Sequence, residues 1–189
     1  MAILLAIFGY SLLPPASVQV RQPEKVVVPS NQASPAPLEI NRGIPVRLQI
    51  PSIGVDAPVE YTGVNAAGDM VAPTGTSSVG WYKLGAIPGN VGSAVMDGHV
   101  VGPKGEPAVF ARLNKLKPGD QIMVVDAKGL AATFVVREVR TYSETEQHDA
   151  VFNSTSGTHL NIITCAGEWD SAQRHYLNRF VVFADKSST

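Results

Sequence analysis

The side chains in this chain best suited to covalent chemistry are those of a cysteine, the only one present, and an arginine that follows it. Cys165 ends the apolar run 160–165, and Arg179 opens a second apolar run that continues to residue 184. Short runs of Ile, Val and Phe between Gly, Asp and Asn are typical of buried strands. We therefore expect two strands joined by a polar loop, with the thiol and the guanidinium at facing strand ends.

A thiol beside a cation suits nucleophilic catalysis. The thiolate is the reactive form of cysteine, and a neighbouring guanidinium or imidazolium makes it easier to form. A lone cysteine is more often a buried residue that acts as a small hydrophobic side chain. The cysteine alone therefore leaves two interpretations open, a nucleophile and an inert core residue.

The acid–base partner that a thiol needs can come from four histidines. His99 follows the small apolar run 92–96 and Gly98, where the backbone can turn sharply. Because functional residues gather where strands end, we expect His99 to be the partner. Asp97 has the same strand parity, so it either orients His99 or is a turn carboxylate. The other three histidines lie in or beside polar loops: His148, His159 and His175.

Length and composition limit what such a site can belong to. The 189 residues suit one domain with a real core, and 44% apolar residues is typical of a globular protein. Only 16% of the residues are charged, so the surface relies on uncharged polar side chains. The net charge of -1 gives no electrostatic basis for binding nucleic acid. The single cysteine excludes an internal disulfide.

The N-terminal region differs in texture from the rest. Residues 2–13 are apolar, but they are fewer than the roughly 20 that a membrane-spanning helix needs. We interpret 1–13 as the remnant of an N-terminal membrane anchor, with a helix packed on the domain as the alternative. The Pro-rich segment 14–42 is expected to be an extended linker, or an arm lying across the domain. The expected location is therefore extracytoplasmic, anchored to the cell membrane.

From residue 43 to residue 186 the chain has the pattern of short strands separated by turns. Pro58 makes the second of these strands an edge strand. The segment 109–116 suits one or two helical turns, and 142–158 is a polar loop with room for a short strand or helical turn. This pattern, without βαβ alternation, predicts an all-β domain that forms a closed or nearly closed barrel. Besides the two strands already named, strands are expected at 46–50, 55–61, 79–82, 92–96, 121–125 and 131–139.

These features resemble the sortases, cysteine transpeptidases of Gram-positive and related bacteria. The resemblance rests on the run 163–165 that ends in Cys165, on Arg179 before the terminal strand, and on Gly98-His99 after a small apolar strand. It covers about 47–184 in the order His, Cys, Arg, and it is closest to the class F branch. The resemblance implies a closed eight-stranded sortase-type β-barrel. Other matching segments are 50–55, 80–82, 109–113 and 118–120.

The resemblance also implies roles for these residues. Cys165 attacks a peptide carbonyl as thiolate and forms a thioacyl intermediate, while Arg179 donates hydrogen bonds to the oxyanion or the incoming peptide. His99 protonates the leaving amine and then takes a proton from the amine or water that attacks the intermediate. Thr164 either contacts the substrate or only suits a strand. Arg174 competes with Arg179 for the role of donor.

The implied partners are a sorting-signal peptide of the LPxTG type from a secreted surface protein, and an amine acceptor from a cell-wall precursor or a pilin. The peptide is expected to bind near 142–158. Three acidic residues of that segment are interpreted as solvated, so no metal and no cofactor is expected. A monomer is the default expectation. The acidic residues are Glu144, Glu146 and Asp149.

Three alternatives remain. A sortase-fold peptidase would mainly hydrolyse its thioacyl intermediate. An L,D-transpeptidase should carry a histidine immediately before its cysteine, where this chain has the apolar and hydroxyl residues 162–164. A non-enzymatic, wall-associated barrel would hold an inert Cys165 that resists thiol reagents, because burial raises the pKa of a thiol.

Overall fold

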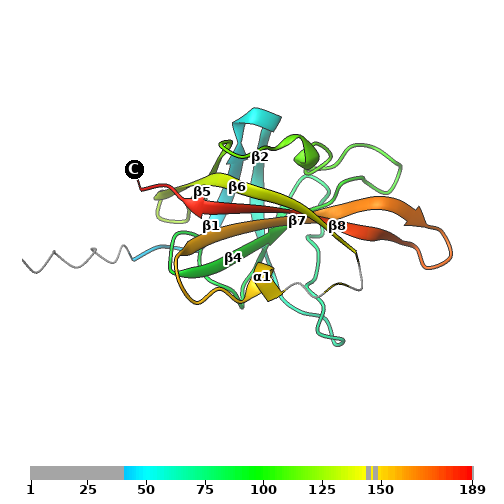
Figure 1. Ribbon diagram of the computed structural model, residues 1–189, viewed down its shortest axis with the longest axis horizontal. Helices are drawn as coiled ribbons and strands as arrows, with labels where there is room; N and C mark the ends of the chain where they lie inside the picture. Colours follow the sequence, from blue (N-terminus) through cyan, green and yellow to red (C-terminus); the bar gives the residue numbers. More distant parts are fainter. Residues whose placement is uncertain (1–40, 144–145, 147–148, 189) are drawn as a thin grey trace, which may run out of the picture. The chain divides into compact units, whose positions relative to one another are not determined.

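The computed structural model describes residues 41–143, 146 and 149–188. Within them, the strands are β1 (Pro45–Ile50), β2 (Val55–Thr62), β3 (Val79–Tyr82), β4 (Gly92–Asp97), β5 (Gln121–Asp126), β6 (Ala131–Ser143), β7 (Thr158–Asp170) and β8 (His175–Lys186). The helical segments there are two 3-10 turns, η1 (Pro51–Ile53) and η2 (Leu113–Lys115), and the single turn α1 (Asp149–Phe152). The strands close into a barrel in the order β1-β2-β3-β4-β7-β8-β6-β5 (Figure 1). The predicted closed eight-stranded all-β barrel is confirmed.

The apolar segment 1–13 and nearly all of the linker 14–42 lie outside the described residues, so both stay predictions. In the part of the chain that the structure describes, no helix is long and apolar enough to cross a membrane. His148 and Glu144 also lie outside it.

The strand that contains Pro58 is not an edge strand, and this prediction was wrong. β2 lies between β1 and β3 in the closed barrel. β1 pairs with residues 55–58 of β2, whereas β3 pairs with residues 59–62. Pro58 therefore lies where one partner strand ends and the other has not begun. Its missing N–H donor is tolerated there for the same reason that proline is tolerated at a sheet edge.

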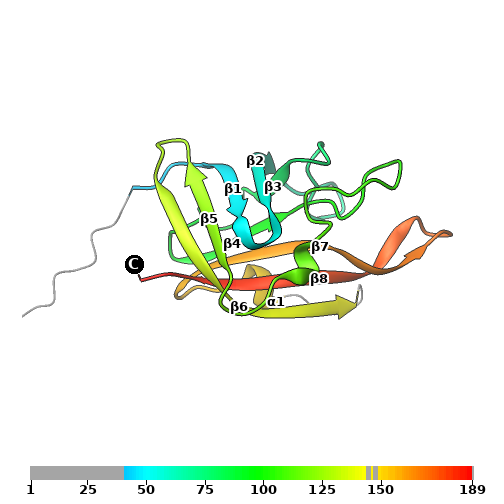
Figure 2. The same ribbon diagram turned by 90° about the horizontal axis from the view of Figure 1, so that it is seen from above.

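The polar loop predicted between Cys165 and Arg179 is also corrected by the structure, because most of this segment belongs to the two strands. β7 continues to Asp170 and β8 begins at His175, so only residues 171–174 connect them. β4 pairs with β7 only as far as Ile163, and beyond that point β7 pairs with β8 alone. The two strands therefore leave the barrel together as an arm (Figures 1 and 2).

A bulge lies at the base of this arm, between Ala166 and Trp169. Gly167 adopts a φ of 78°, and a Cβ there would lie 2.5 Å from the side-chain nitrogen of Asn178. Only glycine suits both conditions. Farther along the arm, Trp169 and Tyr176 face each other as a T-shaped ring pair with centroids 5.1 Å apart. Such cross-strand aromatic pairs stabilise a two-stranded ribbon.

The barrel interior is filled by apolar side chains at alternate strand positions. In β5, Ile122 and Val124 are buried, whereas Gln121 is exposed. This is the period of two that the sequence shows. The largest fully buried side chains of the interior include Leu48, Ile50, Phe110, Phe134, Leu160 and Ile162.

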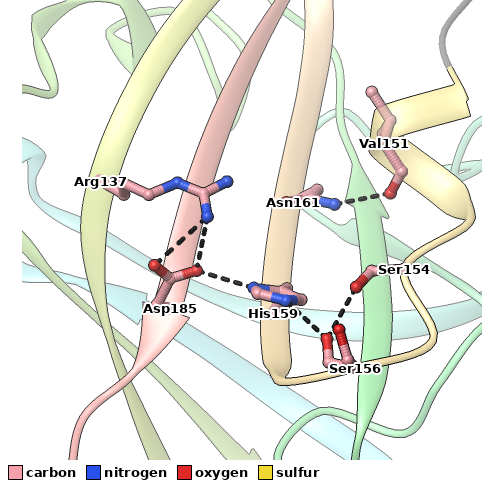
Figure 3. Close-up of polar contacts among 7 residues, drawn as sticks. All are labelled: Arg137, Val151, Ser154, Ser156, His159, Asn161 and Asp185. Carbon is pink, nitrogen blue, oxygen red and sulfur yellow. Dashed lines mark hydrogen bonds and ion pairs between the residues drawn. The ribbon is translucent and has the colours of Figure 1, made fainter.

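A second, smaller core lies on the outer face of the barrel, under α1. Val95 of β4 belongs to this outer core, while Met96 belongs to the interior. Val151 of α1 is fully buried in the outer core, and Asn161 of β7 donates a hydrogen bond of 2.6 Å to its carbonyl (Figure 3). Of the two possibilities predicted within 142–158, a short strand or a helical turn, the structure has the helical turn, and it packs on the outside of the barrel.

A polar cluster ties the connection between α1 and β7 to β8 (Figure 3). Nδ1 of His159 lies 2.7 Å from Oδ1 of Asp185, and its Nε2 lies 2.9 Å from the carbonyl oxygen of Ser156. Arg137 donates to the same Asp185 oxygen at 3.2 Å. His159 is therefore a structural residue at the end of β7 that lies away from Cys165.

Replacing His159 by alanine is expected to lower the free energy of unfolding by about 1 kcal/mol, because hydrogen bonds to a partly exposed charged group contribute about that much. The variant should keep wild-type activity per folded molecule, because the cluster lies away from the thiol. Urea unfolding measures the change. A variant that unfolds at the same urea concentration as the wild type would show that the cluster does not stabilise the barrel.

Candidate functional site

Cys165 and Arg179 are direct partners in the ladder between β7 and β8. Opposite residues of an antiparallel pair lie on the same face, with Cβ atoms about 4.5–5.5 Å apart. The structure therefore brings the thiol and the guanidinium together as the sequence predicts. They lie along continuous strands, however, and not at strand ends.

The guanidinium of Arg179 is held in place by its own strand. Its Nη1 donates to the carbonyl of Tyr176 at 2.7 Å and to that of Asn178 at 3.0 Å. The remaining fork of Nε and Nη2 offers donors to a substrate oxygen. Arg174 lies exposed in the connection at the tip of the arm, with a φ of 59°. Of the two arginines, the structure brings Arg179 to the thiol.

His99 follows β4, which runs parallel to β7, and two contacts extend the pairing of these strands. Gly98 N donates to the carbonyl of Ile163 at 3.3 Å, and the hydroxyl of Thr164 donates to the carbonyl of Gly98 at 2.8 Å. His99 directly follows Gly98, and Cys165 directly follows Thr164. The register therefore places the histidine level with the cysteine.

Gly98 has a different purpose from the one predicted. It does not adopt a positive φ, but a Cβ there would lie 2.6 Å from the ring of Phe110. The missing side chain makes room for this ring. The backbone N–H of Phe110 in turn donates to the carbonyl of His99 at 2.9 Å, which fixes the backbone of the histidine.

The imidazole of His99 contacts a backbone carbonyl. Its Nε2 lies 2.9 Å from the carbonyl oxygen of Pro73, in the connection between β2 and β3. A carbonyl oxygen only accepts hydrogen bonds, so Nε2 must carry the proton in this contact. Nδ1 is therefore the nitrogen that can take up and release a proton during chemistry.

Two other predicted residues have defined surroundings. Thr164 is buried, with 6% of its surface exposed, and its hydroxyl proton is used by Gly98. Oδ1 of Asp97 is buried without a hydrogen-bond partner among the described residues. Burial raises the pKa of Asp97 from 3.8 to about 7, and the charge of Glu60 adds to the rise. The described residues show no hydrogen bond between Asp97 and His99, so the structure does not show the orienting role that was one of the two predictions for Asp97.

A cavity of about 230 Å³ opens beside Cys165. The thiol is half-buried, and this burial raises its pKa above the ordinary value. The guanidinium of Arg179 opposes the rise, whereas the charge of Asp97 adds to it. The thiol is therefore protonated in the resting protein at neutral pH. The cavity walls also include Val100, Val101, Phe110, Asn114, Tyr176 and Phe180.

Replacing Asp97 by asparagine is expected to stabilise the protein at pH 8 and to change it little at about pH 4. A carboxyl with a raised folded pKa contributes most stability below its unfolded pKa of 3.8, and this stability is lost as the pH rises to the folded pKa of about 7. Asparagine cannot ionise and so escapes the loss. Thermal unfolding of the wild type and the variant at the two pH values measures this difference in stability. If the stability of both proteins depended on pH in the same way, the burial of an ionisable Asp97 would be contradicted.

Sequence reasoning missed several residues of the site. Tyr176 and Phe180 line the cavity from β8. They share one face of β8, and strand parity places Arg179 on the other face, so the pairing of Arg179 with Cys165 did not point to them. Pro73 acts through its backbone, and no residue-type pattern signals such a contact. In the part of the chain that the structure describes, no group of three or more His, Cys, Asp or Glu is placed to hold a metal ion.

The fold and the site together define a class of protein, a closed β-barrel in which a thiol on β7 lies opposite a guanidinium on β8. Residues 48–187 match the family model of the Sortase domain. The chain therefore belongs to the sortase family, and it is a sortase-type transpeptidase. No curated protein matches the chain by sequence.

Solved sortase structures share its fold. Sortase C-1 from Actinomyces oris gives a TM-score of 0.60 at 22% identity, over 76% of this chain and 74% of that chain. Sortase C1 from Streptococcus suis gives 0.61 at 19% identity, over 78% and 75%. The lid mutant of sortase A from Corynebacterium diphtheriae gives 0.61 at 19% identity, over 81% and 75%. At these identities the likeness concerns the fold.

Proposed function

We propose that this chain is a class F-type sortase that cleaves an LPxTG-type sorting signal and joins the acyl part to an amine of a cell-wall precursor or a pilin. The observation that carries the proposal is the direct pairing of Cys165 with Arg179, with His99 level with them in the segment that follows β4. These three side chains supply a nucleophile, an oxyanion donor and a proton carrier.

The acylation step follows from the protonation states. Because the resting thiol is protonated, Cys165 must first transfer its proton to Nδ1 of His99. The thiolate then attacks the scissile carbonyl carbon, and Arg179 donates to the oxygen that gains negative charge. The C–N bond breaks as the imidazolium returns a proton to the leaving amine. The product is a thioester on Cys165.

The transfer step reverses these roles. An incoming amine gives a proton to His99 and attacks the thioester carbonyl. The C–S bond breaks, the new amide is released, and the thiolate recovers its proton. We propose that the apolar cavity beside Cys165 holds part of the sorting peptide next to the scissile bond, where Thr164 also lines the wall.

The location and the partners belong to the same proposal. We assign residues 1–13 to the remnant of a membrane anchor and 14–42 to the linker, so that the barrel lies on the extracytoplasmic side. The substrates are then secreted surface proteins, and the enzyme acts as a monomer without cofactor.

The test is incubation of the chain with a fluorogenic LPxTG-type peptide, with and without triglycine, followed by mass spectrometry of protein and products. We expect a thioacyl adduct on Cys165 and an amine-joined product. An adduct with hydrolysed product alone would favour the peptidase alternative. Neither adduct nor cleavage across a panel of sorting motifs, together with resistance of Cys165 to alkylation, would favour the inert barrel.

A further inference from the structure

The contact that orients His99 depends on one peptide group. The carbonyl of Pro73 accepts from Nε2 of the imidazole at 2.9 Å. The N–H of Thr74 belongs to the same planar peptide unit and points to the opposite side of it. Whatever holds that N–H therefore fixes the direction of the carbonyl.

The group that holds the N–H is a carboxylate on the neighbouring strand. Glu60 of β2 accepts from the backbone nitrogen of Thr74 at 3.0 Å and from its hydroxyl at 2.9 Å, both on Oε2. The hydroxyl of Ser78 also hydrogen-bonds to Glu60. These bonds, led by the Thr74 amide, lower the pKa of Glu60, so it is ionised at neutral pH.

We propose that Glu60 is a positioning residue for His99 and acts through the 73–74 peptide. The carboxylate holds the N–H side, and the carbonyl side holds Nε2 of the imidazole. In a Ser-His-Asp triad the carboxylate contacts the imidazole directly. Here a peptide group lies between them, and it is polarised by hydrogen bonds on both sides. The inference rests on the proposed role of His99 in the reaction.

The loop has other anchors, so this role can be separated from folding. The backbone nitrogen of Val71 donates to the carbonyl of Gly63 at 2.9 Å, and that of Val109 donates to the carbonyl of Thr76 at 2.8 Å. Loss of the carboxylate leaves both anchors in place. It frees the 73–74 peptide to rotate, while the loop remains attached to the barrel on either side.

The test compares Glu60→Ala, Glu60→Gln and Asp69→Ala. Asp69 lies in the same loop but bonds to the Asn65 side chain, so its variant is the matched control. We expect Glu60→Ala to lose about tenfold in kcat, a fraction of the 10²–10⁴ that an acid–base group supplies, with KM for the peptide unchanged. Glu60→Gln keeps an acceptor oxygen for Thr74 and should recover most of the rate.

A second readout does not depend on activity. In ¹⁵N NMR spectra of the imidazole, wild-type protein and Asp69→Ala should show His99 with a slowly exchanging Nε2 proton, and Glu60→Ala should lose this signal. If the wild type forms no adduct but the signal still responds to Glu60, the positioning stands and the proposed function fails. An unchanged signal and kcat in Glu60→Ala would overturn the positioning role. Equal loss in the alanine and glutamine variants, with lowered stability, would also overturn it.

Discussion

Cys165→Ala is expected to abolish both cleavage of the sorting peptide and the covalent adduct. The alanine variant has no sulfur to form the thioester, and water is not activated in its place. Removal of the nucleophile from a covalent mechanism costs on the order of 10⁶-fold in kcat in well-studied hydrolases, and a loss of at least 10⁴-fold is expected here. Peptide cleavage and intact-protein mass spectrometry measure it.

The folded state should survive this change, because Cys165 is half-buried and no disulfide is lost. Circular dichroism and urea unfolding of the variant serve as the control. Retention of full activity by Cys165→Ala, or loss of activity from His148→Ala alone, would show that the nucleophile or its partner has been assigned to the wrong residue.

Arg179→Ala is expected to lower kcat by about 10²–10³-fold, the usual cost of removing one oxyanion donor. The variant should also react more slowly with iodoacetamide at a given pH, because the guanidinium opposes the raised pKa of Cys165. Loss of the guanidinium leaves burial and the charge of Asp97 unopposed. Rates of cleavage and of alkylation against pH measure the two effects.

Arg174→Ala is the matched control for this prediction. It removes the same charge from the same hairpin, but at the exposed tip of the arm. It should keep wild-type cleavage and alkylation. If the Arg174 variant loses activity while the Arg179 variant keeps it, the donor role belongs to Arg174, and the pairing across the ladder has no catalytic meaning.

The sequence predicts the strands with one buried face well. Leu48 and Ile50 in β1, and Ile122 and Val124 in β5, alternate with more exposed residues, and burial on one face is what creates this period. The pairing of Cys165 with Arg179 follows from the same signal, since an apolar run identifies each of their strands. The closed eight-stranded architecture came from the family resemblance, and the register confirms it.

The arm could not be predicted in this way. Its residues pair only with each other and have no core to face, so segment 167–177 shows no apolar alternation. Its polar and glycine residues favour a loop on composition alone. The prediction of an edge strand from Pro58 failed for a related reason. Where β2 changes its partner from β1 to β3, the backbone of Pro58 has the same freedom from pairing as at a sheet edge.

The contacts that run from Glu60 through the 73–74 peptide to His99 could not be predicted for another reason. It passes through a backbone carbonyl, and any residue at position 73 would supply one. Only the folded arrangement of β2, its following loop and the end of β4 shows that these groups meet. Asp97 lies closer to His99 in the chain, yet the part of the chain that the structure describes shows no hydrogen bond between them, and the contact to the imidazole comes from the carbonyl of Pro73.

The pairing of Cys165 with Arg179 through strand register has a consequence for length variation. In the mechanism that we propose, the chemistry depends on which residues lie opposite each other in the ladder, and the number of residues between Cys165 and Arg179 can vary. Beyond the bulge, the described residues of the hairpin form ladder pairs only with each other and none with β4 or β6. The tip at 171–174 can therefore lengthen, shorten or accept an inserted peptide without moving Cys165 or Arg179. One residue inserted in β8 between Arg179 and the barrel would instead turn the guanidinium to the other face. The tip is therefore the natural place to graft a tag or a binding module onto this enzyme.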